Sequence, residues 1–227
     1  MIERTNGNGN DMSEKTVGPR VGSSYPSFET CVGFHGGACI GLATGYRAAT
    51  AAMSALRVSR PHDEELVCIA KTDACGVDAI QVVTGCIAGK GNLAVHDCGK
   101  HFFSSISRMS ARAVRFRVRP DASPEPTEMD GLRKKVRSGA ATPDEQSRYR
   151  ALVRAAMERV LTLPRGDVVE FRGVLAEPSR VARIYASIDC ARCGEPVADA
   201  KTRIVEGFRV CIPCAEEICR ERGNRNA

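Results

Sequence analysis

Four cysteines near the C-terminal end of the chain occur in two pairs that have the spacing of a metal site. The pairs are Cys190-Ala-Arg-Cys193 and Cys211-Ile-Pro-Cys214, and residues 194–210 separate them. A Cys-x2-Cys turn places two sulfur atoms on one side of the backbone, and two such turns complete a tetrahedral shell of thiolates. We therefore predict that these four cysteines bind one structural zinc ion, because a closed shell leaves no open position for water or substrate.

The residues around these pairs predict a small finger over 188–222. Gly194 follows the first pair, at a position where such a turn often needs a positive φ. The segment between the pairs predicts a hairpin that turns at Glu206 and Gly207, and the segment after Cys214 predicts a helix. Turn, hairpin and helix together are typical of a treble-clef or zinc-ribbon finger.

A second group of thiols, with an imidazole, occurs in the N-terminal half. His35 and Cys39 lie in a glycine-rich turn directly before a helical pattern, and Cys75 lies at the start of another. We expect both thiols at helix N-termini, where the helix dipole favours the thiolate. The sequence therefore predicts a cleft that either holds a metal or acts in catalysis, with Cys39 or Cys75 as nucleophile and His35 as base.

Four polar residues accompany this group as candidate cofactor-binding positions. Asp78 and Gln81 follow Cys75 on roughly the same side of its helix, and Lys90 and Lys100 lie in glycine-containing loops. A carboxylate and two lysines at the ends of elements are suited to hold a small molecule or a metal-containing cofactor beside the thiols.

The elements that must position these residues indicate an α+β fold, with a central buried helix against a β-sheet. Apolar residues at helical spacing, or in short runs, indicate the individual elements. In chain order, we predict a helix over 40–57, a strand over 66–70, a helix over 75–84, and strands over 93–96, 101–107 and 112–119. We expect the strands over 93–96 and 101–107 to form a hairpin around the intervening turn.

Composition changes divide the chain into four segments. Three prolines at 120–126 mark the end of the core and the start of a connecting segment, for which we predict helices over 130–138 and 143–161 and short strands over 167–174 and 181–187. The four segments are a tail expected to be disordered over 1–27, an α+β core over 28–120, the connecting segment over 121–187, and the finger over 188–222.

Composition also bounds the class of protein. The chain has 227 residues, of which 43% are hydrophobic, and its net charge of +6 permits contact with nucleic acid without indicating it. The first twenty residues lack an apolar core, and no apolar run reaches the roughly 18 residues of a membrane span. We therefore expect a cytoplasmic protein with no membrane contact, whose 11 cysteines act as metal ligands or reactive thiols rather than disulfides.

Several motifs resemble the FmdE family, which is named after formylmethanofuran dehydrogenase. They are FHGGACIGLATGYRAA, DACGVDAIQVVTGCIAGKGNL, DCGK and CARCGEPV…GFRVCIPC, and they extend from Phe34 to Cys214. The resemblance implies an α+β core, a connecting segment, a C-terminal zinc finger, and a homodimer with a cleft lined by the cysteine and histidine of these motifs.

The chain departs from the family pattern in the glycine-rich turn. Relatives usually have F-H-G-H-x-C-P-G there, and Gly37 replaces the second histidine of that pattern. The loss of one imidazole leaves His35 and Cys39, to which Cys75 can add a third ligand for a second transition metal.

Three functions remain open at this point. The first, which we expect, is an FmdE-like metal-binding protein with an accessory or redox role around a metal or metal cofactor. The second is an enzyme with Cys39 or Cys75 as nucleophile. The third is a regulator that binds nucleic acid through the finger. The expected partners are a second copy of the chain and a small-molecule or metal-cofactor ligand; nucleic acid is not expected.

Overall fold

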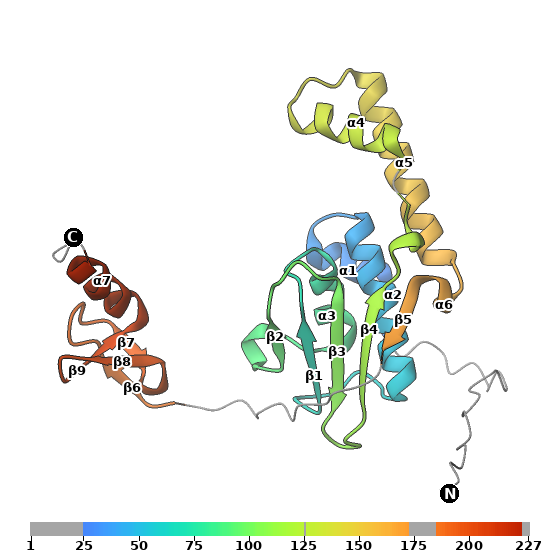
Figure 1. Ribbon diagram of the computed structural model, residues 1–227. Coiled ribbons are helices and arrows are strands. Elements are labelled where there is room, and N and C mark those ends of the chain that lie inside the picture. The colour runs from blue at the N-terminus through green and yellow to red at the C-terminus, as the bar shows by residue number, and fades with distance from the viewer. Residues whose placement is uncertain (1–24, 125, 173–184, 224–227) are drawn as a thin grey trace, which may run out of the picture. The chain divides into compact units, whose positions relative to one another are not determined.

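The computed structural model describes residues 25–124, 126–172 and 185–223 (Figure 1). The chain divides into two compact units, residues 1–180 and 181–227, and each unit is described by itself. The expected tail up to residue 24, and the predicted strand positions 173–174 and 181–184, lie outside the described residues. No helix in the described ranges is long and apolar enough to cross a membrane.

A five-stranded sheet forms the centre of the first unit. Its strand order is β2-β1-β3-β4-β5, in which β1 and β2 are parallel and the other neighbours are antiparallel. Alternation places Phe103 and Phe116 opposite each other on the buried face, with their ring centroids 5.7 Å apart. The strands are β1 (Leu66–Ala70), β2 (Leu93–Val95), β3 (Phe102–Ser107), β4 (Ala113–Val118) and β5 (Val169–Arg172).

Helix α2 (Ile40–Leu56) is the buried central helix that the sequence predicts, and it shares one core with the sheet. Leu42, Met53 and Leu56 on this helix are almost fully buried, so the predicted fold class is confirmed. The remaining helices of the unit are α1 (Phe28–His35), α3 (Gly76–Thr84), α4 (Thr127–Arg137), α5 (Pro143–Thr162), α6 (Arg165–Val168), and the 3-10 helices η1 (Ala88–Lys90) and η2 (Pro120–Ala122).

The predicted hairpin between 93–96 and 101–107 is wrong, because β1 lies between β2 and β3. The chain leaves β1 through α3 and η1 and returns as a parallel strand, so β2 and β3 occupy opposite edges of β1. The expected turn instead passes over the end of β1, where the N–H groups of Cys98 and Lys100 donate to the carbonyl of Lys71 (3.2 and 3.0 Å).

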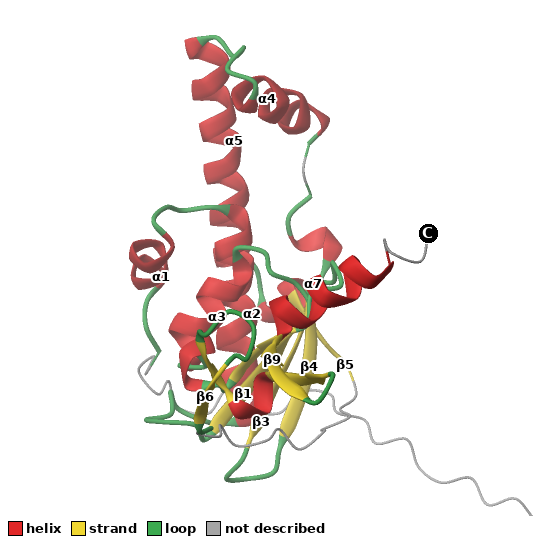
Figure 2. Ribbon diagram, turned by 90° about the vertical axis from the view of Figure 1, so that its left-hand side faces the viewer, coloured by secondary structure: helices red, strands yellow, loops and turns green. Residues whose placement is uncertain are grey.

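The core extends beyond the boundary that the sequence predicts at residue 120. Strand β5 pairs with β4, which completes the sheet at its far edge. Helix α5 packs on α2, and the guanidinium of Arg47 donates to the carbonyls of Val160 (3.1 Å) and Leu163 (2.6 Å). Figures 1 and 2 show that α5 continues away from the sheet and that α4 packs against its N-terminal half.

The second unit has the finger architecture predicted from the sequence. The predicted hairpin is confirmed, and it turns at Glu206 (φ 54°) and Gly207 (φ 85°). The predicted helix is also confirmed. The elements are β6 (Ser187–Asp189), β7 (Pro196–Ala198), the 3-10 helix η3 (Asp199–Lys201), β8 (Thr202–Val205), β9 (Phe208–Cys211) and α7 (Ile212–Gly223).

Candidate metal centres

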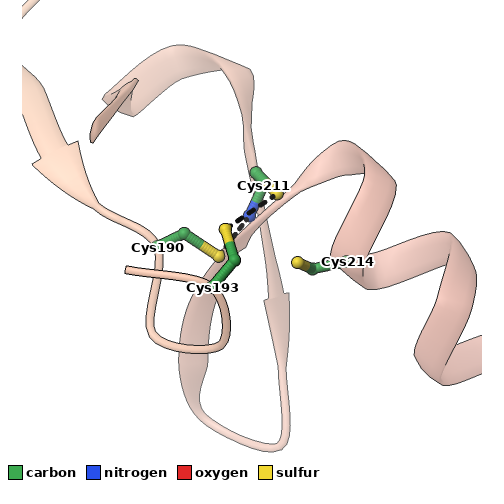
Figure 3. A group of neighbouring side chains, drawn as sticks. All are labelled: Cys190, Cys193, Cys211 and Cys214. Atoms are coloured by element: carbon green, nitrogen blue, oxygen red, sulfur yellow. Dashed lines mark hydrogen bonds between the residues drawn. The ribbon is translucent and has the colours of Figure 1, made fainter. Parts of the chain in front are cut away.

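The four finger cysteines point toward one another (Figure 3). Their sulfur atoms all lie within 4.8 Å of one another, and the Sγ atoms of Cys193 and Cys211 are 3.9 Å apart. A tetrahedral site with Zn–S bonds of about 2.3 Å separates its sulfur atoms by about 3.8 Å. The cluster therefore has the donor set and the dimensions of a closed, structural zinc site.

Two kinds of local structure position these thiols. The first pair lies in a turn after β6, where Gly194 has a φ of 75° and donates its N–H to the carbonyl of Cys190 (2.9 Å). The second pair comes from the end of β9 and the first turn of α7. The N–H of Cys211 donates to Sγ of Cys190 (3.2 Å), a contact that stabilises a thiolate.

Two of the four thiols have pKa values shifted in opposite directions. Hydrogen bonds from the backbone N–H groups of Cys193 and Cys211 lower the pKa of Cys190 to about 6. The neighbouring thiol of Cys211, followed by burial, raises the pKa of Cys214 to about 12. Without a cation, the thiolate of Cys190 is thus favoured and that of Cys214 is disfavoured, whereas a zinc ion would stabilise all four thiolates.

The second cluster lies where the ends of α1, α2 and α3 meet. His35 is the last residue of α1, Cys39 is the N-cap of α2, and Cys75 is the N-cap of α3. One ligand atom from each of these residues lies within 4.8 Å of the other two. The structure thus brings together the three residues that the sequence singles out, and it confirms that both thiols lie at helix N-termini.

Helix α1 was not predicted, because Gly33 within it and Gly36 and Gly37 after it favour a turn. It begins after Ser27, whose hydroxyl accepts the N–H of Thr30 (3.3 Å), and it ends at Gly36, which has a φ of 85°. The glycine-rich turn is therefore shorter than expected, and His35 is held on a helix instead of a loop.

Three glycines allow the helix ends to approach. A Cβ at Gly45 would lie 2.3 Å from the carbonyl oxygen of Gly76, so only glycine fits at this crossing of α2 and α3. A Cβ at Gly41 would lie 3.3 Å from Cβ of Cys75 and 3.9 Å from Sγ of Cys39. Backbone contact between the two helices therefore sets the separation of the two thiols.

Asp78 positions the histidine. Its Oδ2 atom lies 2.6 Å from Nδ1 of His35, and the side chain of Gln81 donates to its Oδ1 atom (3.3 Å). The Nε2 atom of His35 is left facing Sγ of Cys39, 3.8 Å away. A carboxylate on the outer ring nitrogen is the usual support of a metal-binding histidine, so Asp78 and Gln81 lie where they would support His35 as a candidate ligand.

Burial governs the titration of Cys39. The N–H of Leu42 donates to its sulfur (3.3 Å), as expected at a helix N-terminus. Desolvation outweighs this contact, however, and raises the pKa of Cys39 above its ordinary value. The expectation that the helix dipole makes Cys39 a ready thiolate is therefore wrong in direction for the metal-free thiol.

The two candidate lysines lie in different places. Lys90 lies on η1, with its ammonium 3.4 Å from the carbonyl of His62, and it does not line the cavity that contains Lys100. That cavity is about 490 Å³, and the first turn of α2 forms part of its wall. Arg117 and Arg119 also line it. Neither arginine is a candidate from the sequence, because nothing local indicates that the end of β4 faces the start of α2.

Two family models match this chain. Residues 34–170 match the family described as "FmdE, Molybdenum formylmethanofuran dehydrogenase operon". Residues 183–218 match the "Prokaryotic dksA/traR C4-type zinc finger", which covers all four finger cysteines. The chain therefore carries a C4 zinc finger after its core.

A curated relative and a solved structure are also similar. A "Probable S-adenosyl-L-methionine-binding protein" of Archaeoglobus fulgidus is 29% identical over 192 residues, which cover 80% of this chain and 50% of the relative. This chain thus spans about half the length of that protein. A solved structure from Syntrophus aciditrophicus, a "tungsten formylmethanofuran dehydrogenase subunit e (fmde)-like protein", has the same fold. The TM-score is 0.54 and the sequence identity is 20%, and the match covers 83% of this chain and 90% of that one. Because the first family match covers more than half of the sequence, this chain belongs to the FmdE family.

Proposed function

We propose that this chain binds a transition-metal ion through His35, Cys39 and Cys75 and has an accessory or redox role around that metal or a metal-containing ligand. The observation that supports this most directly is the convergence of three ligand atoms within 4.8 Å, with the histidine supported by Asp78. In this proposal the protein is a cytoplasmic homodimer, and zinc in the finger is structural.

The donor set determines the chemistry that such a site can support. Two thiolates and one imidazole favour zinc or another borderline divalent metal over magnesium or calcium. Three protein ligands leave one tetrahedral position open, as in catalytic rather than structural zinc sites. A bound metal would therefore supply one coordination position for an external ligand. The A. fulgidus relative has a description that names S-adenosyl-L-methionine, so this compound is a first small molecule to titrate.

The two alternative functions receive less support. Burial raises the pKa of Cys39, whereas a nucleophilic thiol needs a lowered one. On the finger, Arg192 is ion-paired with Glu217 and Glu221, and Arg209 is ion-paired with Asp199. These carboxylates reduce the positive charge that the finger would offer to a phosphate backbone.

Metal analysis of the purified full chain tests the proposal. We expect two metal ions per chain in the wild type and one in Cys39→Ser, with finger zinc retained. Cys190→Ser should also hold one metal, but at the core site. Cys98→Ser is a matched control, because Cys98 is exposed and belongs to neither cluster, and it should keep two. A wild type with a single zinc, lost in Cys190→Ser and kept in Cys39→Ser, would contradict the core metal site.

A further inference from the structure

The cavity beside the core cluster has a strongly basic wall. It has a volume of about 490 Å³, which lies in the range of small-molecule pockets. Lys100, Arg117 and Arg119 line it, and none of the described residues of its wall is acidic. The pocket therefore combines the size of a ligand site with a positive charge that suits an anion.

The three cations differ in how far they are already neutralised. Arg117 contacts Glu170 through its Nε atom (2.7 Å), and Arg119 contacts Asp121 (3.3 Å). Lys100 is exposed, and its ammonium makes no hydrogen bond or ion pair with any residue in the described ranges. The terminal nitrogens of Arg117 also have no hydrogen-bond partner among those residues. Lys100 and the terminal nitrogens of Arg117 are thus available as donors in the cavity wall.

The pocket and the core cluster share the first turn of α2. Gly41 lines the pocket, and a Cβ at this position would lie within 4.0 Å of the Sγ atoms of both Cys39 and Cys75. The N-terminus of a 17-residue helix adds its positive dipole end to the same region. The basic pocket and the thiol cluster are therefore adjacent at the first turn of α2.

We propose that this pocket binds an oxyanion group, a phosphate or a carboxylate, of the ligand that occupies the open position of the core metal. The link to the metal rests on the function proposed above. The anion pocket itself depends on other residues, chiefly Lys100, with Arg117 and Arg119. Lys100 supplies the main charge-assisted hydrogen bond, because its ammonium is not paired within the described part of the protein.

Calorimetric titration of the full chain with pyrophosphate, and separately with malonate, tests the pocket. We expect Lys100→Ala to weaken binding by about tenfold, which corresponds to the loss of one charge-assisted hydrogen bond. Lys90→Ala is the matched control, since it removes a lysine from the same domain outside the pocket, and its affinity should equal that of the wild type. Preference for pyrophosphate or for malonate then identifies the phosphate or the carboxylate as the bound group.

Two results would overturn the inference: no binding of either anion by the wild type, or equal weakening in Lys100→Ala and Lys90→Ala. The Cys39→Ser variant separates this failure from a failure of the proposed function. If the wild type holds two metals but binds neither anion, the pocket assignment is wrong while the metal site stands. If the anions bind as expected but Cys39→Ser keeps both metals, the metal assignment is wrong while the pocket stands.

Discussion

Gly45 on α2 and Gly76 on α3 are in direct backbone contact, so close that a Cβ on Gly45 would lie 2.4 Å from Cα of Gly76. This crossing brings the N-caps of the two helices together, and with them Cys39 and Cys75. A side chain at position 45 must therefore separate the helices and the two thiols.

We expect Gly45→Ala to lower the free energy of unfolding by at least about 1–3 kcal/mol, the usual cost of overpacking, and to abolish metal binding at the core cluster. Gly131→Ala is the matched control, because Gly131 lies inside α4 with no atom within 4 Å of an added Cβ. It should stabilise the protein by about 0.5–1 kcal/mol. Denaturant unfolding and metal analysis provide both measurements, and equal effects of the two substitutions would refute this account.

Removal of the Asp78 carboxylate charge should weaken the core metal site without changing its ligands. In Asp78→Asn, the hydrogen bond to Nδ1 no longer holds the ring and its tautomer as firmly, so we expect metal affinity to fall by about 10–100-fold. Competition with a chromophoric chelator measures this. Asp73→Asn, at an exposed position just before α3, should keep wild-type affinity. A wild-type affinity in Asp78→Asn would show that Asp78 does not support the ligand.

The thiol of Cys39 should react slowly at neutral pH in the metal-free protein. Because burial raises the pKa of Cys39, less of the reactive thiolate is present at a given pH than for an ordinary cysteine, whose pKa is about 8.5. The rate of iodoacetamide labelling, followed by mass spectrometry of the Cys39 peptide, should still rise above about pH 8.5. A labelling profile with its midpoint below about 8.5 would instead favour the nucleophile hypothesis.

Zinc binding by the finger should strengthen as pH rises through neutrality. At pH 7 the metal-free finger carries Cys190 as thiolate, because its pKa is about 6, and Cys214 as thiol, because its pKa is about 12. Zinc must therefore displace a proton from Cys214, so affinity rises with pH in this range, whereas the proton of Cys190 matters only below about pH 6. Calorimetry in buffers of different ionisation enthalpy measures the released protons. An affinity that is constant between pH 6 and 8 would contradict this order of ionisation.

Much of the local structure could be predicted from the sequence, because it depends on residues that are close along the chain. The apolar spacing of α2 and the short run of β1 gave bounds that the structure reproduces to within one residue. The two Cys-x2-Cys pairs predicted the finger cluster for the same reason, since each turn supplies two thiols by itself and one hairpin joins the turns.

The tertiary arrangement could not be predicted in the same way. The apolar runs that become β2 and β3 can be recognised in the sequence. That β1 lies between them cannot, because long-range pairing determines which strands are neighbours. Likewise, the local pattern ends the core before β5, which joins the sheet through its long-range pairing with β4 and the burial of Val169 in the core.

The residue types of the candidate core ligands were therefore evident from the sequence, whereas their geometry was not. His35 and Cys39 are near neighbours, but Cys75 joins them only because α2 and α3 pack through glycine at their crossing. Burial at that junction also reversed the direction expected for the pKa of Cys39. The effect of the helix dipole depends on one helix, whereas desolvation depends on every element packed around the thiol.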